Sequence, residues 1–251
     1  KFIIENNDRS CEASNSDRWG KKGDLLWDSS YVIKYYYKCT YPHCRKPGMI
    51  DLSKAVKKTD NEYFPKIKTK KLNIEEISNK SKLTYKEAII QSMNNLSKKG
   101  AIFIGYNVIF GNAMGTLKDV PDEQKIETPV AENLMTGLAI GISFEGFLPV
   151  LYFERHDFMM VAADSIINHI DKIERISHGE FKPRIIIRAV TADAGPFYSG
   201  ITHSQDFTDV FKKALSFPVL DPKHSDQILK IFEFEESEKR PIMLIERKSC
   251  Y

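Results

Sequence analysis

The sequence predicts an α/β fold, a doubly wound parallel sheet with helices on both faces, plus an irregular N-terminal arm. Two observations lead to this prediction. From Leu83 onward, short apolar runs alternate with longer segments whose apolar residues recur at helical spacing. Runs such as AIFIG (101–105) and RIIIRAV (184–190) are almost continuously hydrophobic, as strands buried on both faces require. This alternation is typical of crossover units, whose strands are parallel.

The expected elements follow one another from residue 84. Helical spacing predicts helices over 84–96, 129–144, 158–174, 205–215 and 226–234. The strands expected between and after them are 101–105, 147–153, 184–190, 217–220 and 241–246. One apolar stripe of the second helix consists of Val130, Leu134, Leu138 and Ile142. In the third helix the residues in register are Phe158, Ala162, Ile166 and Ile170.

Residues 1–82 differ in composition from the rest. They are polar and contain several tyrosines, and their lysine-rich stretch, 54–82, reads as a solvated face. We interpret 1–82 as an N-terminal arm or extension, and 83–251 as the folded domain. The thiols of Cys39 and Cys44 have no second ligand pair at zinc spacing, so no metal site is expected.

Size, charge and cysteine content limit the class of protein. The chain has 251 residues, a net charge of +3 and 42% hydrophobic residues, so it can bury a core and charge alone does not favour nucleic acid. Four scattered cysteines favour a reducing cytoplasm. No run is long enough to span a membrane, and residues 1–10 do not read as a secretory signal. An organellar location stays open, because the sequence begins at Lys1 and leaves room for a targeting segment before it.

Polar residues gather where the strands are expected to end. In parallel sheets, ligands bind beyond the carboxyl ends of the strands. Glu132, Phe158 and His203 lie on or just after the loops at that edge. The three loops expected there are 106–128, 154–157 and 191–204.

Glu132 has two interpretations. Thr128 and Pro129 are predicted as N-cap and first helical residue. The capping-box position is then Ala131, so Glu132 lies one residue past it. Spacing alone favours a first-turn acid that interacts with the helix dipole. The alternative is a carboxylate that takes part in chemistry.

The helix of Glu132 is rich in small residues. Gly137 and Gly141 lie one turn apart and allow a sheet or another helix to approach the backbone closely. The face of Glu132 also carries small side chains: Thr136, Ala139 and Ser143. We therefore expect close contacts along this helix.

His203 lies in THSQDF, just before a predicted helix for which Ser204 is the expected N-cap. One interpretation is a loop histidine without a role. A Ser–His catalytic pair is disfavoured, because adjacent side chains diverge. Asp193 and Asp206 are the acids considered for orienting the imidazole.

Segment 84–246, about two thirds of the chain, resembles the pyrimidine-binding domain of thiamine-diphosphate enzymes. It is most similar to the β subunit of the 2-oxo acid dehydrogenase decarboxylase component, of the pyruvate and branched-chain types. The TP-x-x-E, D-x-I-x-N and HSQ elements are specific in combination. The matching pieces are KKGAIFIG, ETPVAENLMTGLAIG, FLPVLYFERHDFMMVAADSIIN and GITHSQDF.

The resemblance implies a role for each of four residues. Glu132 would contact N1′ of the cofactor's aminopyrimidine and share a proton with it, which lets the 4′-amino group remove the thiazolium C2 proton. Val130 would line the pyrimidine pocket, and Phe158 would pack on the pyrimidine ring. His203 would face the substrate and intermediates, where it can donate or accept protons.

The resemblance also implies partners. The cofactor would be thiamine diphosphate with Mg²⁺, and the substrate a small 2-oxo acid. The GDG signature that binds the diphosphate is absent, so an α-type partner chain, in a heterotetramer, is expected to hold diphosphate and metal. The family's usual C-terminal domain is also absent, which leaves docking to a lipoyl carrier open. No nucleic acid and no membrane are expected as partners.

The chain departs from the family at the expected site. Glu154, Arg155 and His156 stand where pyruvate-type enzymes have mostly apolar or small residues, so a more polar pocket and a substrate other than pyruvate are expected. Two alternatives are a transketolase-like half-enzyme, which HSQ disfavours, and a catalytically idle partner subunit, which intact Glu132 and His203 disfavour. A third is an unrelated doubly wound binding domain.

Overall fold

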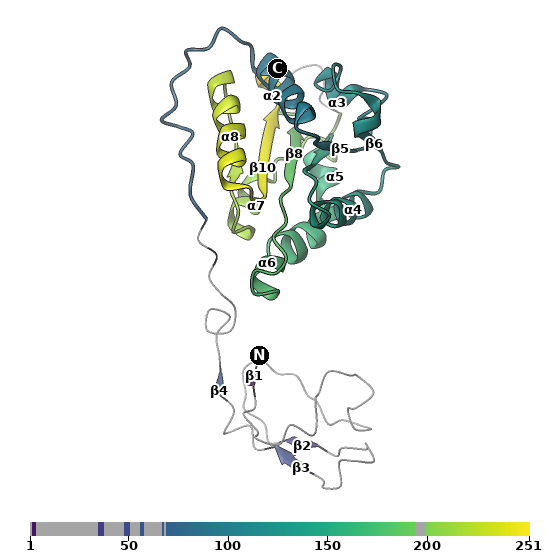
Figure 1. The fold of residues 1–251 in the computed structure, drawn as a ribbon, viewed down its shortest axis with the longest axis vertical. Coiled ribbons are helices and arrows are strands. Elements are labelled where there is room, and N and C mark those ends of the chain that lie inside the picture. The colour runs from purple at the N-terminus through teal and green to yellow at the C-terminus, as the bar shows by residue number, and fades with distance from the viewer. Residues whose placement is uncertain are drawn as a thin grey trace. The chain divides into compact units, whose positions relative to one another are not determined.

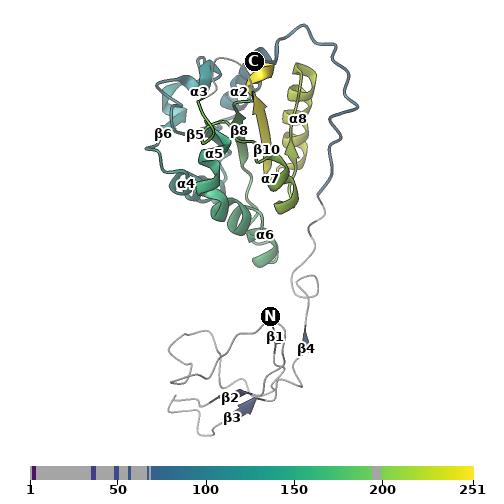
Figure 2. The same ribbon diagram turned by 180° about the vertical axis from the view of Figure 1, so that it is seen from behind.

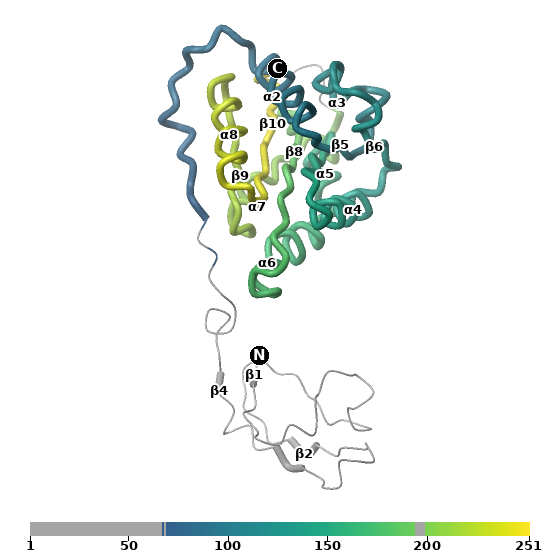
Figure 3. The backbone as a smooth tube through the Cα atoms, viewed as in Figure 1, coloured from purple at the N-terminus to yellow at the C-terminus, as the bar shows by residue number. Residues whose placement is uncertain are grey.

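The computed structural model describes residues 67, 69–193 and 199–251, together with the strand segments 2–3, 35–37, 48–50 and 56–57 (Figure 3). Contacts divide the chain into two units, Lys1–Pro65 and Lys66–Tyr251. In the first, β1 (Phe2–Ile3) pairs with β4 (Val56–Lys57) and β2 (Tyr35–Tyr37) with β3 (Gly48–Ile50), both antiparallel. Most of the predicted arm, with Cys39 and Cys44, lies outside the described residues.

The second unit contains a six-stranded sheet in the order β6-β5-β7-β8-β10-β9, and every neighbouring pair is parallel. Its strands are β5 (Ile102–Gly105), β6 (Lys125–Glu127), β7 (Pro149–Phe153), β8 (Ile186–Thr191), β9 (Val219–Leu220) and β10 (Ile242–Arg247). The predicted fold class is therefore confirmed. After β5 the chain adds β6 on one side of it and then β7 on the other side. This reversal of direction makes a topological switch point beside β5.

Helices cover both faces of this sheet (Figures 1 and 2). One core lies under α2 (Tyr85–Lys98) and α8 (Ser225–Glu238). The other lies under α4 (Glu132–Phe144), α5 (His156–Met159) and α7 (Thr208–Ala214). Within the part of the chain that is described, no helix is both long and apolar enough to span a bilayer.

The start of α2 follows from its sequence. The Thr84 hydroxyl accepts a hydrogen bond from the Glu87 backbone N–H (3.2 Å), and the Glu87 carboxylate accepts one from the Thr84 N–H (2.8 Å). This reciprocal capping box satisfies two backbone donors that the helix leaves unpaired. The segment before α2, residues 69–81, lies against α8. There the Ile74 carbonyl accepts a hydrogen bond from Gln227 (2.8 Å), and Asp226 accepts one from the Ser81 N–H (2.7 Å).

Helix α4 begins at Glu132, so the predicted start at Pro129 is wrong. The Thr128 N–H donates to the Gly105 carbonyl (3.0 Å), which continues the β6–β5 ladder beyond Glu127. Thr128 is thus held in the sheet and does not cap the helix. The N-cap is Ala131, which has no side-chain acceptor.

Most of the predicted apolar stripe of α4 does not face the sheet, although its last residue, Ile142, packs against the core. Leu134 is 62% exposed and Leu138 is 39% exposed, whereas the buried residues of the helix are Glu132, Met135, Thr136, Ala139 and Ser143. Small side chains on the buried face let α4 approach the sheet closely, as sheet–helix packing at native density requires. Leu134 and Leu138 are left on the outer face, whereas Met135 and Ile142 pack against the core.

The third predicted helix, 158–174, is a succession of shorter helical segments. Following α5, a 3₁₀ turn covers Met160–Ala162, a π-helix covers Ser165–Ile170, and α6 covers Ile173–Ile176. Three of the four residues predicted to lie in register, Ala162, Ile166 and Ile170, are buried in the core, whereas Phe158 is only partly buried. A π-helical turn inserts an extra residue into a helix and rotates the residues on its C-terminal side.

The expected loop 106–128 contains the edge strand β6, a 3₁₀ turn and the short helix α3 (Asn112–Gly115). Asn112, Ala113 and Met114 have φ angles of 47°, 45° and 61°. Non-glycine residues in this left-handed region cost about 1–2 kcal/mol each. The loop is tied to β6 through the Glu127 carboxylate, which accepts hydrogen bonds from the backbone N–H groups of Asn107 (2.5 Å) and Ile109 (2.7 Å).

A buried ion pair crosses from β8 to β10 under α2. The Arg188 guanidinium donates to the Glu246 carboxylate from Nε (2.5 Å) and Nη2 (2.9 Å), and Nη2 also donates to Thr116 (2.9 Å). Neither charged side chain is exposed to solvent. Burial alone would lower the pKa of Arg188, but the Glu246 carboxylate holds the pKa above its usual range. The Tyr251 hydroxyl also donates to Glu246.

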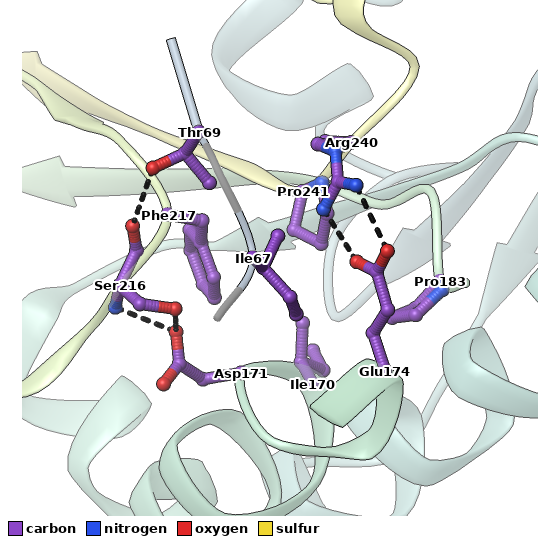
Figure 4. A pocket seen from close by; sticks show the side chains of 10 residues that line it. All are labelled: Ile67, Thr69, Ile170, Asp171, Glu174, Pro183, Ser216, Phe217, Arg240 and Pro241. Atoms are coloured by element: carbon purple, nitrogen blue, oxygen red, sulfur yellow. Dashed lines mark hydrogen bonds and ion pairs between the residues drawn. The ribbon is translucent and has the colours of Figure 1, made fainter. Parts of the chain in front are cut away.

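Polar contacts close the amino-terminal edge of the sheet, where the strands begin. They surround a hollow of about 20 Å³ (Figure 4). Arg240 donates to the Glu174 carboxylate from both terminal nitrogens, one of them at 2.8 Å. Asp171 accepts hydrogen bonds from the Ser216 N–H and hydroxyl, both at 2.6 Å. The hollow is too small for an organic cofactor.

We predict that Glu246→Gln lowers the free energy of unfolding by about 3–5 kcal/mol, because it leaves the Arg188 charge buried without a counter-charge. Urea unfolding followed by circular dichroism measures this. The control is Glu233→Gln, which removes an exposed carboxylate paired with Lys230 on α8. Equal unfolding midpoints for the two variants would contradict the prediction.

Candidate functional site

Three predicted residues share the carboxyl edge of the sheet. Glu132 begins α4, shortly after β6 ends. Phe158 lies in α5, which begins three residues after β7 ends. His203 lies in the loop after β8. Each residue thus follows a different strand of one parallel sheet, where such folds bind ligands.

The rings of Phe158 and His203 are in contact. Their centroids are 5.3 Å apart, and the planes meet at 85°, an edge-to-face arrangement that aromatic pairs favour. The Thr202 hydroxyl lies 2.9 Å from His203 Nδ1. The expectation that Asp193 or Asp206 orients this imidazole is wrong, because their carboxylates bind Ser249 and Arg247 instead.

Glu132 is only 8% exposed. Its backbone carbonyl accepts a hydrogen bond from the Thr136 hydroxyl (2.8 Å), but no described residue donates one to its carboxylate. Its carboxylate oxygens are not enclosed away from solvent, so water or a bound ligand can supply the hydrogen-bond donor. Val130, two residues earlier, is 62% exposed.

The loop of His203 is held by two residues that precede Phe158. Asp157 accepts hydrogen bonds from the Gln205 amide (2.7 Å) and backbone N–H (3.4 Å). His156 Nδ1 accepts one from the Phe207 N–H (3.1 Å). Sequence reasoning identified His156 as a departure from the family but not this function.

His156 is completely buried, and burial lowers its pKa to about 4. The ring is therefore neutral near pH 7. Since Nδ1 accepts from Phe207, the proton lies on Nε2, which has no hydrogen-bond partner among the described residues. The nearest carboxylate to Nδ1 is that of Asp206, at 3.7 Å.

Arg247, at the end of β10, holds the same loop from another strand. It pairs with Asp206 (2.8 Å) and Asp221 (2.9 Å). Burial alone would raise the pKa of Asp206, but hydrogen bonds from Thr208 and Arg247 lower it to about 2. Asp206 also accepts the Thr208 N–H (2.9 Å) at the start of α7, so the predicted N-cap, Ser204, is wrong.

The described residues contain no group of three or more His, Cys, Asp or Glu side chains placed to hold a metal ion. At this edge, Asp193, Asp206 and Asp221 are each bound to a cation or donor within the chain. Glu132 differs from them, because no described residue donates a hydrogen bond to its carboxylate.

Known proteins with similar sequences are β subunits of dehydrogenases. The chain is 25% identical over 176 residues to the mitochondrial pyruvate dehydrogenase E1 component subunit beta of Saccharomyces cerevisiae, which is 67% of this chain and 48% of the relative. It is 27% identical over 177 residues to the mouse protein of that name, with 67% and 48% covered. It is 24% identical over 178 residues to the 2-oxoisovalerate dehydrogenase subunit beta of Bacillus subtilis, with 68% and 54% covered.

The chain resembles the β subunits of 2-oxo acid dehydrogenases. It spans about half the length of these curated relatives. No family model matches it. Among solved structures, a split gene transketolase, described as an inactive β4 tetramer, is 16% identical with a TM-score of 0.53, over 67% of this chain and 52% of that one. This likeness concerns the fold. The resemblance to these β subunits that the sequence motifs predict is therefore confirmed.

We predict that the free energy of unfolding falls more steeply with decreasing pH in the wild-type chain than in the His156→Asn variant. The pKa of His156 is about 4 when folded and about 6.5 when unfolded, so protons bind the unfolded chain preferentially as the pH falls below 6.5. Between pH 7 and pH 5 this loss amounts to about 2 kcal/mol. Urea unfolding at both pH values measures it, and parallel curves for the two proteins would contradict it.

Proposed function

We propose that this chain is the pyrimidine-side subunit of a split thiamine-diphosphate-dependent enzyme that acts on a 2-oxo acid, by decarboxylation or by transfer of the activated aldehyde. The observation that supports this best is the largely buried residue Glu132, to whose carboxylate no described residue donates, at the same edge as the Phe158–His203 pair. The names of the sequence relatives, pyruvate and 2-oxoisovalerate dehydrogenase β subunits, support the same substrate class.

The residues at this edge fit the pyrimidine half of the cofactor. No described residue donates to the Glu132 carboxylate, so this carboxyl group can share a proton with N1′ of the pyrimidine. When bound, thiamine diphosphate supplies a thiazolium carbon that attacks the 2-oxo group and accepts the electrons of decarboxylation. Glu132 would hold the proton at N1′, and Phe158 would offer an aromatic surface to the ring.

His203 and Val130 complete the proposed set. The ring of His203 lies against Phe158, so a histidine proton donor or acceptor would lie next to the ring-binding surface. Val130 would close the pyrimidine pocket only when another molecule covers it, because its side chain is now exposed. The polar residues Glu154 and Arg155 make a substrate other than pyruvate part of the proposal.

A second chain is proposed to complete the site. Three segments that follow strands at the carboxyl edge each expose a large apolar side chain: Phe110 after β5 is 85% exposed, Val130 after β6 is 62% exposed and Ile201 after β8 is 80% exposed. Apolar side chains gathered at one edge are typical of a surface that another protein covers. The partner would be an α-type subunit that binds the diphosphate and Mg²⁺, in a heterotetramer.

The outer face of α4 supports an assembly as well. A Cβ atom placed on Gly137 or Gly141 would meet nothing within 4 Å, so the predicted close packing at these glycines has no partner among the described residues. Leu134 and Leu138 border the glycines and are exposed. Small residues flanked by apolar ones let another helix approach the backbone closely.

A transketolase-like half-enzyme is the second candidate, because the fold matches that of a split gene transketolase. The substrate distinguishes the two, since a 2-oxo acid loses carbon dioxide whereas a ketose donor transfers a two-carbon unit. Docking to a lipoyl carrier stays part of the first candidate only. The compartment is proposed as the cytoplasm or an organelle, because several relatives are named as mitochondrial proteins.

We predict that Glu132→Gln abolishes activation of the cofactor and leaves the fold intact. Glutamine has nearly the same shape but no acidic proton to share with N1′, and a first-turn acid contributes only about 0.3–1 kcal/mol to the helix. Proton–deuterium exchange at C2 of thiamine diphosphate, in the complex reconstituted with the copurifying partner and Mg²⁺, measures this step. Wild-type exchange in the variant would refute the proposed role, and circular dichroism controls for folding.

We predict that Phe110→Asp prevents binding of the partner chain while the variant folds normally, because this side chain is almost fully exposed and contributes little to the core. Size-exclusion chromatography of the variant with the copurifying chain measures association. Ile176→Asp is the matched control, since Ile176 is an exposed apolar residue on α6, far along the chain from the loops at the carboxyl edge. Equal association of the two variants would place the partner elsewhere.

A further inference from the structure

We propose that His156 and Asp157 are positioning residues, which hold residues 199–207 so that the His203 ring lies against Phe158. The catalytic meaning of this arrangement rests on the proposed function, in which His203 faces the substrate. The positioning itself is a property of the chain alone and can be measured without cofactor or partner. This role is assigned to His156, a buried histidine outside the proposed set of cofactor-binding and catalytic residues.

One helical turn supplies both the contacts and the surface. His156, Asp157 and Phe158 are consecutive residues of α5, which packs against β7 and β8. Because the backbone of this turn is shared, a shift of Phe158 carries the two anchoring side chains with it. The aromatic surface and the histidine that meets it are therefore placed by the same short segment.

Asp157 binds the loop two residues after His203. Its carboxylate accepts hydrogen bonds from the Gln205 side chain (2.7 Å) and from the Gln205 N–H (3.4 Å). A single residue is thereby bound through both its backbone and its side chain. Between this contact and His203 only Ser204 intervenes, so the range of positions open to the histidine is small.

His156 binds the loop four residues after His203. Its buried ring accepts the Phe207 N–H at Nδ1 (3.1 Å). In a ring without solvent contact, no water can replace this acceptor when it is removed. Arg247 holds the residue between the two contacts, Asp206, from β10 (2.8 Å). Three consecutive residues, 205–207, are thus each held by a different side chain.

Two variants of His156 separate the hydrogen bond from the volume of the ring. His156→Phe keeps an aromatic ring but has no acceptor for the Phe207 N–H. His156→Asn is smaller, but its side-chain oxygen can occupy the position of Nδ1 and restore the acceptor. If the hydrogen bond positions the loop, asparagine rescues the contact that phenylalanine loses. If only packing matters, phenylalanine is the better replacement.

Asp171 offers a matched control for Asp157. It accepts a backbone and a side-chain hydrogen bond from Ser216, both at 2.6 Å, at the amino-terminal edge of the sheet. Like Asp157, it binds a segment more than forty residues further along the chain. Asp171→Ala therefore removes the same kind of contact without touching residues 199–207.

The experiment is nuclear magnetic resonance of the full chain with isotope-labelled histidine. The His203 ring signal is assigned by its loss in His203→Gln, and Phe158→Leu defines its position without the aromatic contact. We expect Asp157→Ala and His156→Phe to move the His203 signal at least halfway towards its position in Phe158→Leu. His156→Asn and Asp171→Ala should leave it at the wild-type position.

Wild-type His203 signals in both Asp157→Ala and His156→Phe would overturn the proposal, as would a shift of equal size in Asp171→Ala. Where Asp157→Ala does not fold, Asp157→Asn, which keeps one acceptor oxygen, replaces it and should give a shift about half as large. In the reconstituted complex, folded Asp157 variants should lose about tenfold in kcat with an unchanged KM for thiamine diphosphate. Failure of the proposed function would appear instead as normal C2 exchange in Glu132→Gln, with the His203 shifts unaffected.

Discussion

The close approach of β5 to β7 at Gly105 is the constraint on which the arrangement of the site depends. A Cβ atom at this position would lie 2.6 Å from the Tyr152 carbonyl oxygen, so a larger residue would force the two strands apart. The Gly105 carbonyl at the same point accepts the Thr128 N–H at the end of β6. The segments that lead to Glu132 and to Phe158 therefore both start next to Gly105, which places the two proposed ligand-binding residues at the same edge of the sheet.

The fold could be predicted from the sequence because the strands carry a strong signal. The central strands are mostly hydrophobic on both faces, with the buried pair Arg188 and Glu246 as exceptions, and the segments between them are long enough to cross the sheet. β6 was missed because it has only three residues, of which Lys125 and Glu127 are polar. The break of 158–174 into shorter helices was missed as well, since its apolar spacing suits an unbroken helix and local hydrogen bonding decided otherwise.

The site was predicted only in part. Positions at the carboxyl edge follow from strand direction, so the edge shared by Glu132, Phe158 and His203 could be anticipated. The face that α4 turns to the sheet could not, because steric fit favoured Ala139 and Thr136 over the larger Leu134. The anchoring of the His203 loop depends on contacts between residues about fifty positions apart, such as Asp157 with Gln205, for which the sequence has no local signal.

The position of β10 has a consequence for how the protein is made. This strand comes after every other strand of the six-stranded sheet in the chain, yet it lies between β8 and β9. During translation, β8 and β9 leave the ribosome before β10, the strand that lies between them. Until β10 is made, Arg188 has no Glu246 carboxylate to pair with. A nascent chain that pauses before Ile242 exposes an unpaired apolar edge on β8, which is an opening for chaperones and for aggregation.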